Sequence, residues 1–115
     1  MNKTVVNLTP HDVNLYVNNN KVVTYPAKYN KDQQHLIPRC EPQSVQVGYL
    51  NNTIPMYQTV YGEVNNLPAQ TENTVLIVSA LVRTKHPERK DLISPHGLVR
   101  DDKQRVIGCT GFDTN

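Results

Sequence analysis

The chain has 115 residues, enough for one domain with one hydrophobic core, which we assign to residues 1–115. Only 37% of the residues are hydrophobic and 6% aromatic, so Val, Leu and Ile must form the core, and two of these favour strands. The net charge of +2 is too small for a sequence-independent nucleic-acid binder, so we expect no long nucleic acid as a partner.

The N-terminus and the cysteines bear on the cellular compartment. Met1 to Thr4 is polar and no apolar segment follows it, which is unlike a secretory signal. We therefore expect a cytoplasmic protein in which Cys40 and Cys109 are reduced. The longest apolar run, Val75 to Val82, is too short to span a membrane, so no membrane partner is expected.

The first third of the chain predicts short strands. Residues 5–17 alternate apolar and polar side chains on either side of Pro10, which indicates strand, turn and strand. Asn18-Asn19-Asn20 then predicts a tight turn into a strand at residues 21–25, giving a hairpin. Residues 26–40 are polar and punctuated by prolines, which is typical of a long loop.

The middle third predicts a second hairpin and a buried strand. Alternating residues 45–49, an Asn51-Asn52 turn and a strand at residues 54–61 form the hairpin, with Pro55 indicating an edge or a bulge. After a loop at residues 62–74, Val75 to Val82 is rich in β-branched residues and predicts a central strand buried on both faces. A buried helix is the alternative there, because periodicity does not separate the two.

The last third predicts a short helical turn starting at Pro87, a loop at residues 94–97, and a third hairpin over residues 98–109. Together these elements predict a mainly β protein. We expect a single antiparallel, bent sheet or partial barrel with one or two short helical turns.

The sequence shows none of the patterns that usually carry catalysis or bind metals. Zinc sites need closely spaced pairs of Cys or His, whereas the four His and two Cys here are scattered. The five Gly form neither a dinucleotide-binding nor a phosphate-loop pattern, and there is no nucleophile elbow. We therefore predict no catalytic residue, no metal and no cofactor. The acidic pair Asp101-Asp102 is interpreted as turn chemistry.

The arginines are unevenly distributed. Four of the five lie in the last third, and Arg is well suited to bidentate recognition of phosphate. Asp91 and Asp101 are suited to holding the guanidinium groups or to accepting hydrogen bonds from ribose. A solvated face with local Arg–Asp pairs is an equally good interpretation. The predicted ligand-binding residues are Pro10, His11, Asp12, Ser79, Arg83, Arg89, Asp91, Ser94, Arg100 and Asp101.

Two of these predictions are more specific. Arg89 and Arg100 are expected to converge on the phosphates of one ligand, because each lies where a helical turn or a strand ends. The turn at residues 9–12 is expected near the ligand, although a purely structural turn is slightly favoured there. Stacking on a base would use one of six tyrosines, Tyr16, Tyr25, Tyr29, Tyr49, Tyr57 or Tyr61.

Several motifs at both ends of the chain form a recognisable pattern. They are Val6-Asn7-Leu8-Thr9-Pro10-His11, the run Leu76 to Val82, Arg89-x-Asp91-Leu92-x-x-Pro95, Val99-Arg100-Asp101 and Val106-Ile107-Gly108-Cys109. The pattern, NLTPH…RxDLxxP…VRD…GC, resembles a widespread set of short proteins encoded by phages and bacteria. The resemblance is weak from Tyr25 to Met56. Gln104 stands where the pattern has Gly, which suggests a different construction of the last hairpin turn.

This set is similar to phage sponge proteins that sequester cyclic-nucleotide or related signals of bacterial anti-phage defence, including anti-CBASS proteins. The resemblance implies binding of a small phosphorylated ligand without turnover, in the host cytoplasm, with a multimer holding the signal in pockets. A homo-oligomer is also expected from the thin core and from sheet edges that need to be covered.

Two other functions stay open at this point. One is an enzyme that degrades or transfers a nucleotide, with His11 or His86 as the acid–base group. The other is a protein-binding inhibitor or minor virion component, with the long loop at residues 26–40 as its contact surface.

Overall fold

The computed structural model describes residues 3–115 and is mainly β, as the sequence predicts. The strands are β1 (Thr4–Asn7), β2 (Val13–Val17), β3 (Asn20–Tyr25), β4 (Arg39–Leu50), β5 (Ile54–Asn65), β6 (Thr74–Ile77), β7 (Leu92–Arg100) and β8 (Val106–Thr114). Two short helices complete the fold, the 3₁₀ helix η1 (Lys31–Leu36) and α1 (Ala80–Lys85). Within residues 3–115 no helix has the length and hydropathy needed to cross a bilayer.

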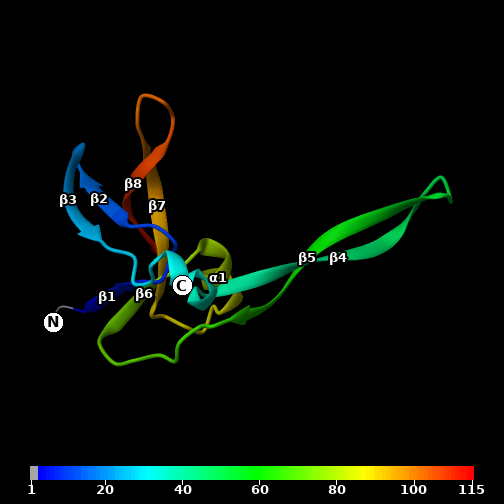
Figure 1. The fold of residues 1–115 in the computed structure, drawn as a ribbon, viewed down its shortest axis with the longest axis horizontal. Coiled ribbons are helices and arrows are strands. Elements are labelled where there is room, and N and C mark those ends of the chain that lie inside the picture. Colours follow the sequence, from blue (N-terminus) through cyan, green and yellow to red (C-terminus); the bar gives the residue numbers. More distant parts are fainter. Residues whose placement is uncertain (1–2) are drawn as a thin grey trace.

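Six strands form a curled sheet in the order β1-β6-β7-β8-β2-β3, and the hairpin β4–β5 forms a separate two-stranded sheet (Figure 1). The prediction of a bent sheet or partial barrel with one or two short helical turns is confirmed, but there are two sheets and the larger one is not purely antiparallel. The pairs β1–β6, β6–β7 and β2–β8 are parallel, and only β2–β3 and β7–β8 within the large sheet are antiparallel. The physical reason is that distant segments, not chain neighbours, pair at the centre of the sheet.

The sheet curls into a half-barrel because its two edges approach each other at one end. Asn7, at the end of β1, forms a parallel bridge with Ala27, just after β3, and its carbonyl accepts a hydrogen bond from the Lys28 amide at 2.9 Å. The side chain of Asn7, which is 2% exposed, donates to the carbonyls of His11 and Tyr25, both at 2.8 Å. This one amide therefore joins the ends of β1 and β3 to the turn between β1 and β2.

The core lies on both sides of β6. Leu76 and Val78 pack in one cluster with Leu8, while Ile77 packs on the other side with Val13. The prediction of a two-sided buried strand is thus confirmed for the first half of residues 75–82 only. Strand β6 ends at Ile77, and the hydroxyl of Ser79 caps α1 by accepting a hydrogen bond from the Val82 amide at 3.2 Å.

Three local expectations also change. Residues 26–40 are not simply a loop, since η1 lies within them and β4 begins at Arg39. Pro87 lies in a turn and starts no helix. Residues 94–97 are part of β7, which is longer than predicted. Cys40 and Cys109 are free thiols buried in different clusters of the core.

The hairpin β4–β5 extends far beyond the half-barrel and makes the molecule 58 Å long (Figure 1). Each of its strands has 12 residues, about twice the usual length of a strand in globular proteins. The hairpin turn falls at Asn51 and Asn52, as predicted, and both have positive φ values (53° and 63°) that asparagine tolerates. We call residues 42–62 the arm.

Candidate ligand-binding groove

A groove of about 440 Å³ lies on the half-barrel beside β2, β7 and β8. Its size is within the range of small-molecule sites. The lining is mainly apolar, with polar groups at the β2 end. The lining residues are His11, Asp12, Val13, Asn14, Tyr16, Pro95, Leu98, Val106, Ile107, Gly108 and Cys109.

The apolar lining includes two side chains that a folded domain would normally cover. Leu98 and Val106 are 55% and 51% exposed although they are aliphatic. Leu98 pairs with Cys109 across the β7–β8 ladder, and Cys109 in turn lies beside Leu15 of β2. The exposed Leu98 and Val106 therefore give the β7–β8 side of the groove an apolar surface, on which a flat apolar group such as a base would bury area.

The polar end of the groove is built by the turn between β1 and β2. His11 is exposed, and its backbone carbonyl is fixed by hydrogen bonds from the side chains of Asn7 (2.8 Å) and Thr9 (2.9 Å). Asp12 accepts a hydrogen bond from the Ala27 amide at 2.9 Å. The turn is thus held rigidly, and both predicted residues line the groove.

Gly108 sets how closely β2 and β8 approach. A Cβ atom at this position would collide with the Tyr16 ring and with the carbonyl oxygen of Asn14. Asn14 also donates from its side chain to the Ile107 carbonyl at 3.0 Å, which ties the same two strands together. The position of the Tyr16 ring against the groove therefore depends on a glycine in β8.

The tip of the β7–β8 hairpin carries Arg100, Asp101 and Arg105. Arg100 pairs with the groove residue Val106 across the ladder, so it lies at the groove's outer end, and its guanidinium donates to the Gln104 carbonyl at 2.9 Å. Asp101 accepts from the Lys103 and Arg105 amides and from the Arg105 side chain at 2.8–3.0 Å. The backbone amide of Arg105 is the main cause that lowers the pKa of Asp101 below its ordinary value.

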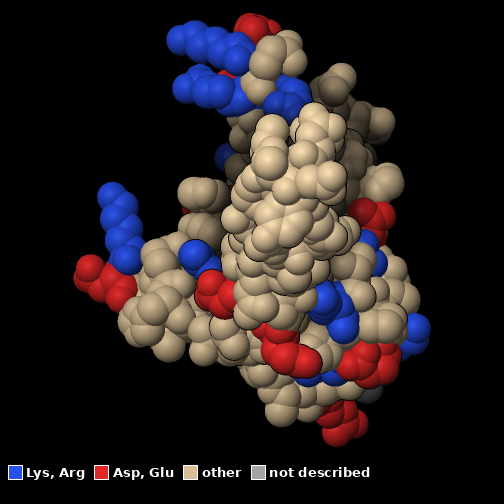
Figure 2. All heavy atoms as spheres, turned by 90° about the vertical axis from the view of Figure 1, so that its right-hand side faces the viewer, with Lys and Arg blue, Asp and Glu red and all other residues tan. Residues whose placement is uncertain are grey.

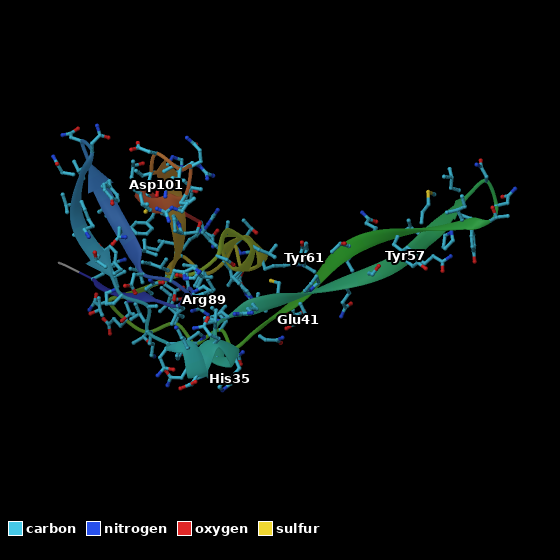
Figure 3. All side chains as sticks on the ribbon, turned by 45° about the horizontal axis from the view of Figure 1, so that its top comes forward. His35, Glu41, Tyr57, Tyr61, Arg89 and Asp101 are labelled. Carbon is cyan, nitrogen blue, oxygen red and sulfur yellow. The ribbon has the colours of Figure 1, made fainter. Side chains whose placement is uncertain are left out.

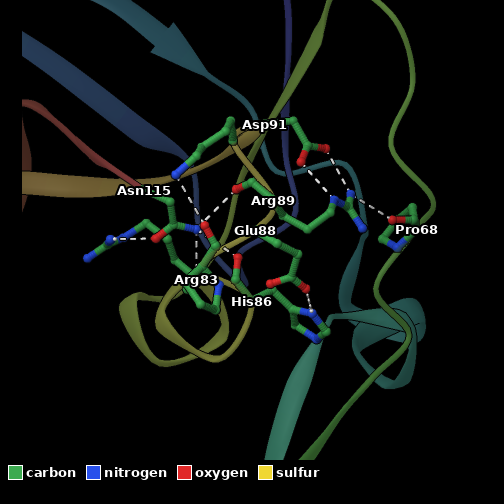
Figure 4. A network of polar contacts seen from close by, with 9 residues as sticks. Pro68, Arg83, His86, Glu88, Arg89, Asp91 and Asn115 are labelled. Carbon is green, nitrogen blue, oxygen red and sulfur yellow. Dashed lines mark hydrogen bonds and ion pairs between the residues drawn. The ribbon is translucent and has the colours of Figure 1, made fainter.

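Arg89 and Asp91 form a buried ion pair away from this tip (Figure 4). The Arg89 guanidinium donates to both carboxylate oxygens of Asp91 at 2.8 Å and to the Pro68 carbonyl at 3.0 Å. The side chains are 16% and 4% exposed. The hydrogen bonds from Arg89 lower the pKa of Asp91, and the same contact raises the pKa of Arg89.

Arg83 and Ser94 belong to a neighbouring network. Arg83 donates from Nε to the Ser94 hydroxyl at 2.9 Å and from Nη1 to the Asn115 side chain at 3.1 Å. The amide of Asn115 donates to the carbonyls of Arg83, His86 and Arg89 at 2.9–3.1 Å (Figure 4). These bonds attach the end of β8 to α1 and to the segment that follows it.

The ten predicted ligand-binding residues therefore do not form one site. Arg89 and Arg100 lie at opposite ends of β7, whose nine residues span about 25 Å; Figure 3 shows Arg89 and Asp101 well apart. The expected convergence of the two arginines on one pocket is wrong. Pro10 and Ser79 line a different hollow of about 370 Å³, together with Arg39 at the start of β4.

Groups that metal binding or acid–base chemistry would use are dispersed. Among residues 3–115, no cluster of three His, Cys, Asp or Glu side chains is arranged to hold a metal ion. His86 contacts Glu88 at 2.8 Å on the surface, outside the groove. Burial raises the pKa of the Cys109 thiol, which keeps this groove residue protonated.

Sequence reasoning missed the aliphatic part of the groove. Leu98, Val106 and Ile107 were interpreted as ordinary residues of a hairpin, and Tyr16 as one of six candidates for stacking. The parallel pairing of β2 with β8, which brings these residues together, has no local signal in the sequence. No protein-family model, curated protein or solved structure matches the chain.

Proposed function

We propose that the protein binds and sequesters a small phosphorylated ligand, a cyclic nucleotide or related nucleotide signal, and thereby inhibits anti-phage defence without cleaving the signal. The carrying observation is the groove, whose apolar surface, Tyr16 ring and polar turn lie together at one end of an arginine-bearing hairpin. The resemblance of the sequence motifs to phage sponge proteins supports the same class of ligand.

Each part of the groove suits one part of a nucleotide. The exposed aliphatic residues and Tyr16 suit a base, since base–aromatic stacking contributes about 1–3 kcal/mol. The carboxylate of Asp12 and the imidazole of His11 suit ribose hydroxyls or the polar edge of the base. Arg100 at the outer end suits the phosphate. Arg89 lies too far along β7 to share that phosphate, so the proposed site uses Arg100 without it.

Sequestration requires tight binding and an unchanged ligand. Nanomolar affinity corresponds to about 12 kcal/mol, so stacking, apolar burial and at least one charged contact must act together. A thermal-shift screen of cyclic dinucleotides, cyclic trinucleotides and ADP-ribose derivatives identifies the ligand. Denaturing the complex and analysing the released nucleotide by chromatography then shows whether it is intact.

The location of the site is tested with variants of the folded protein. Tyr16→Ala and Arg100→Ala should each weaken binding of the best nucleotide at least tenfold, or about 1.4 kcal/mol. Lys31→Ala, an exposed cation on η1 outside the groove, should bind as tightly as the unmodified protein. Lys21 would be a poor control because it pairs with Tyr16.

Two results would overturn the proposal. A screen in which none of these nucleotides shifts the unfolding temperature would remove the ligand class. Release of a cleaved or altered nucleotide would show turnover and favour the enzyme. Equal affinity of the Tyr16→Ala, Arg100→Ala and Lys31→Ala variants would leave the ligand class standing but reject the groove as its site.

A further inference from the structure

The arm differs in charge from the rest of the molecule. Residues 42–62 contain no Asp, Glu, Lys or Arg, although 19% of the chain is charged. Along the sequence the nearest charges are Glu41 and Glu63, one on each strand at the base of the arm. The Lys85 ammonium of α1 also lies at this base, where it donates to the Tyr61 carbonyl at 2.8 Å. Figure 2, which views the arm end-on, shows an uncharged surface over the whole projection, with charged side chains around its base and on the half-barrel behind it.

The arm is also rich in exposed large hydrophobic residues. Their exposed fractions range from 39% to 61%. They are Val45, Val47, Tyr49, Leu50, Ile54, Met56, Tyr57, Val60 and Tyr61. At roughly half exposed, or about 90 Å² each, they present about 800 Å² of side-chain surface. Apolar patches of this size on soluble proteins mark interaction surfaces.

The two faces of the arm have different chemistry. Residues paired across the ladder share a face, and alternate residues along a strand share a face. The pairing of Leu50 with Ile54, together with the alternation along β5, places Ile54, Met56 and Val60 on one face. Tyr57 and Tyr61 lie on the opposite face. We call the first the aliphatic face.

Strand β5 runs from the arm into the half-barrel. Val64, near its end, packs against the core cluster of the half-barrel, and the register of the β4–β5 ladder shifts between this residue and the arm. Outside the half-barrel the aliphatic side chains Ile54, Met56 and Val60 of β5 are exposed. An isolated two-stranded hairpin is at best marginally stable in water, so the arm needs a surface to pack against.

We propose that the arm is a self-association surface, and that its aliphatic face packs against the same face of the arm of a second copy of this chain in a two-fold dimer. In a two-fold contact the same surface patch of both copies meets itself. On a charged patch, identical charges would therefore face and repel each other. The uncharged arm avoids this cost. The five exposed aliphatic residues of this face, Val45, Leu50, Ile54, Met56 and Val60, present about 450 Å². The exposed polar residues Gln43 and Gln58 on the same face extend this surface toward the roughly 800 Å² that each partner buries in a standard interface.

The charges at the base specify the direction of the two arms and disfavour another occupant. If the arms run antiparallel, the Asn51–Asn52 tip of each arm lies near the base of the partner's arm. The Glu41 and Glu63 side chains of one copy then do not face those of the other copy. The same acidic pair opposes insertion of the arm into an anionic membrane surface, which attracts basic residues. This inference is independent of the ligand in the groove, which is formed on the half-barrel.

The test measures mass by sedimentation equilibrium and light scattering. The unmodified protein should have a mass of about 26 kDa, twice the 13.0 kDa of one chain. Met56→Glu places a charge in the centre of the aliphatic face and should raise the dimer dissociation constant at least about a hundredfold. Ile54→Glu should do the same, so the test does not depend on one variant.

The matched control is Val22→Glu, because Val22 is an exposed aliphatic residue (52%) on the edge strand β3, outside the arm. It should leave the dissociation constant within about twofold. Circular dichroism checks that each variant is folded, and a monomeric mass of the unmodified protein refutes the proposal whether or not the variants fold.

Several results would overturn the proposal. One is a 13.0 kDa mass for the unmodified protein at about 100 µM, far above the dissociation constant of a stable dimer. Another is dissociation by Val22→Glu with no effect of Met56→Glu, which would assign the interface to the edge of the half-barrel. A third is a monomer that co-floats with neutral phosphatidylcholine vesicles, which would make the arm a lipid-contacting element.

Discussion

Replacing Arg89 with Ala should destabilise the fold rather than remove a ligand contact. Its guanidinium makes three charge-assisted hydrogen bonds, two to Asp91 and one to the Pro68 carbonyl. Asp91 precedes β7, and its backbone carbonyl accepts a hydrogen bond from the Leu76 amide of β6 at 2.8 Å. The pair therefore connects the centre of the sheet to the segment around Pro68.

The expected loss follows from burial of the carboxylate. With 4% of its side chain exposed, Asp91 in an Arg89→Ala variant would hold a buried charge without its partner. Breaking a buried pair in this way costs about 3–5 kcal/mol, a large part of the total stability of a small domain. Arg105→Ala is the matched control. Because the Arg105 side chain is 71% exposed, its ion pair with Asp101 should contribute much less to the free energy of unfolding.

Urea unfolding at several pH values measures both the size and the cause of the effect. Because the pKa of Asp91 is lowered in the folded state, the pair stabilises the protein above the ordinary carboxyl pKa of 3.8. That contribution is lost as the pH falls through the lower folded-state pKa. The difference in stability between the unmodified protein and Arg89→Ala should therefore be largest at neutral pH and shrink in acid.

The double variant Arg89→Met/Asp91→Leu should recover much of the loss, since apolar residues often replace buried ion pairs at little cost. If the double variant is as unstable as Arg89→Ala, an unpaired carboxylate is not the cause. If Arg89→Ala unfolds at the same urea concentration as the unmodified protein but loses nucleotide affinity, Arg89 is a ligand residue and the structural role argued here is wrong.

The remaining predictions concern Gln104 in the last hairpin turn and two glycines of β8, and can be checked by urea or thermal unfolding. Gln104 has a φ of +65°, so Gln104→Gly should stabilise the protein by about 1 kcal/mol, while Gln104→Ala should give no such gain. Gly108→Ala should cost about 1–3 kcal/mol and weaken nucleotide binding, because the added Cβ collides with the Tyr16 ring and the Asn14 carbonyl. Gly111→Ala, where a Cβ meets no atom within 4 Å, should change the stability by less than about 0.5 kcal/mol; an equal loss at both glycines would contradict the steric reason.

The parts of the fold that local chemistry controls could be predicted. Asn18 and Asn19 both have positive φ values (50° and 67°), the conformation that the tight turn of a two-residue hairpin requires. The same holds for Asn51 and Asn52. All three predicted hairpins therefore occur, although the second and third have longer strands than the alternation of side chains indicated.

The centre of the sheet could not be predicted in the same way. Val5 pairs with Val75, and Leu15 with Cys109, across long stretches of chain. Parallel pairing of this kind depends on tertiary packing and leaves no turn signal in the sequence. Residues 75–82 show a related difficulty, because one run that is apolar except for Ser79 contains both a strand and the start of a helix. The only local sign of the boundary is Ser79, a residue that favours the helix N-cap.

For the candidate site, the sequence predicted which residue types form polar contacts better than it predicted where those residues lie. The two Arg–Asp motifs were weighed equally as a phosphate site and as local ion pairs. The structure forms the local pair of Arg89 with Asp91, whereas Asp101 pairs with Arg105 and Arg100 donates to the Gln104 carbonyl. By contrast, His11 and Asp12 line the groove, although their turn was slightly favoured as purely structural. The turn has both roles, structural and groove-lining, because the hydrogen bonds that hold it rigid also place these side chains at the groove.

The proposed ligand-binding groove and the proposed self-association surface lie on separate parts of the chain. The groove is lined by residues 11–16 and 95–109 of a single chain, so a second copy is not needed to complete it. The arm extends away from the half-barrel (Figure 1), and residues 42–62 contribute nothing to the groove lining. A dimer formed through the arms would therefore leave both grooves open. It follows that a dimer should hold two ligands independently, and that a monomeric Met56→Glu variant should keep the affinity of each groove.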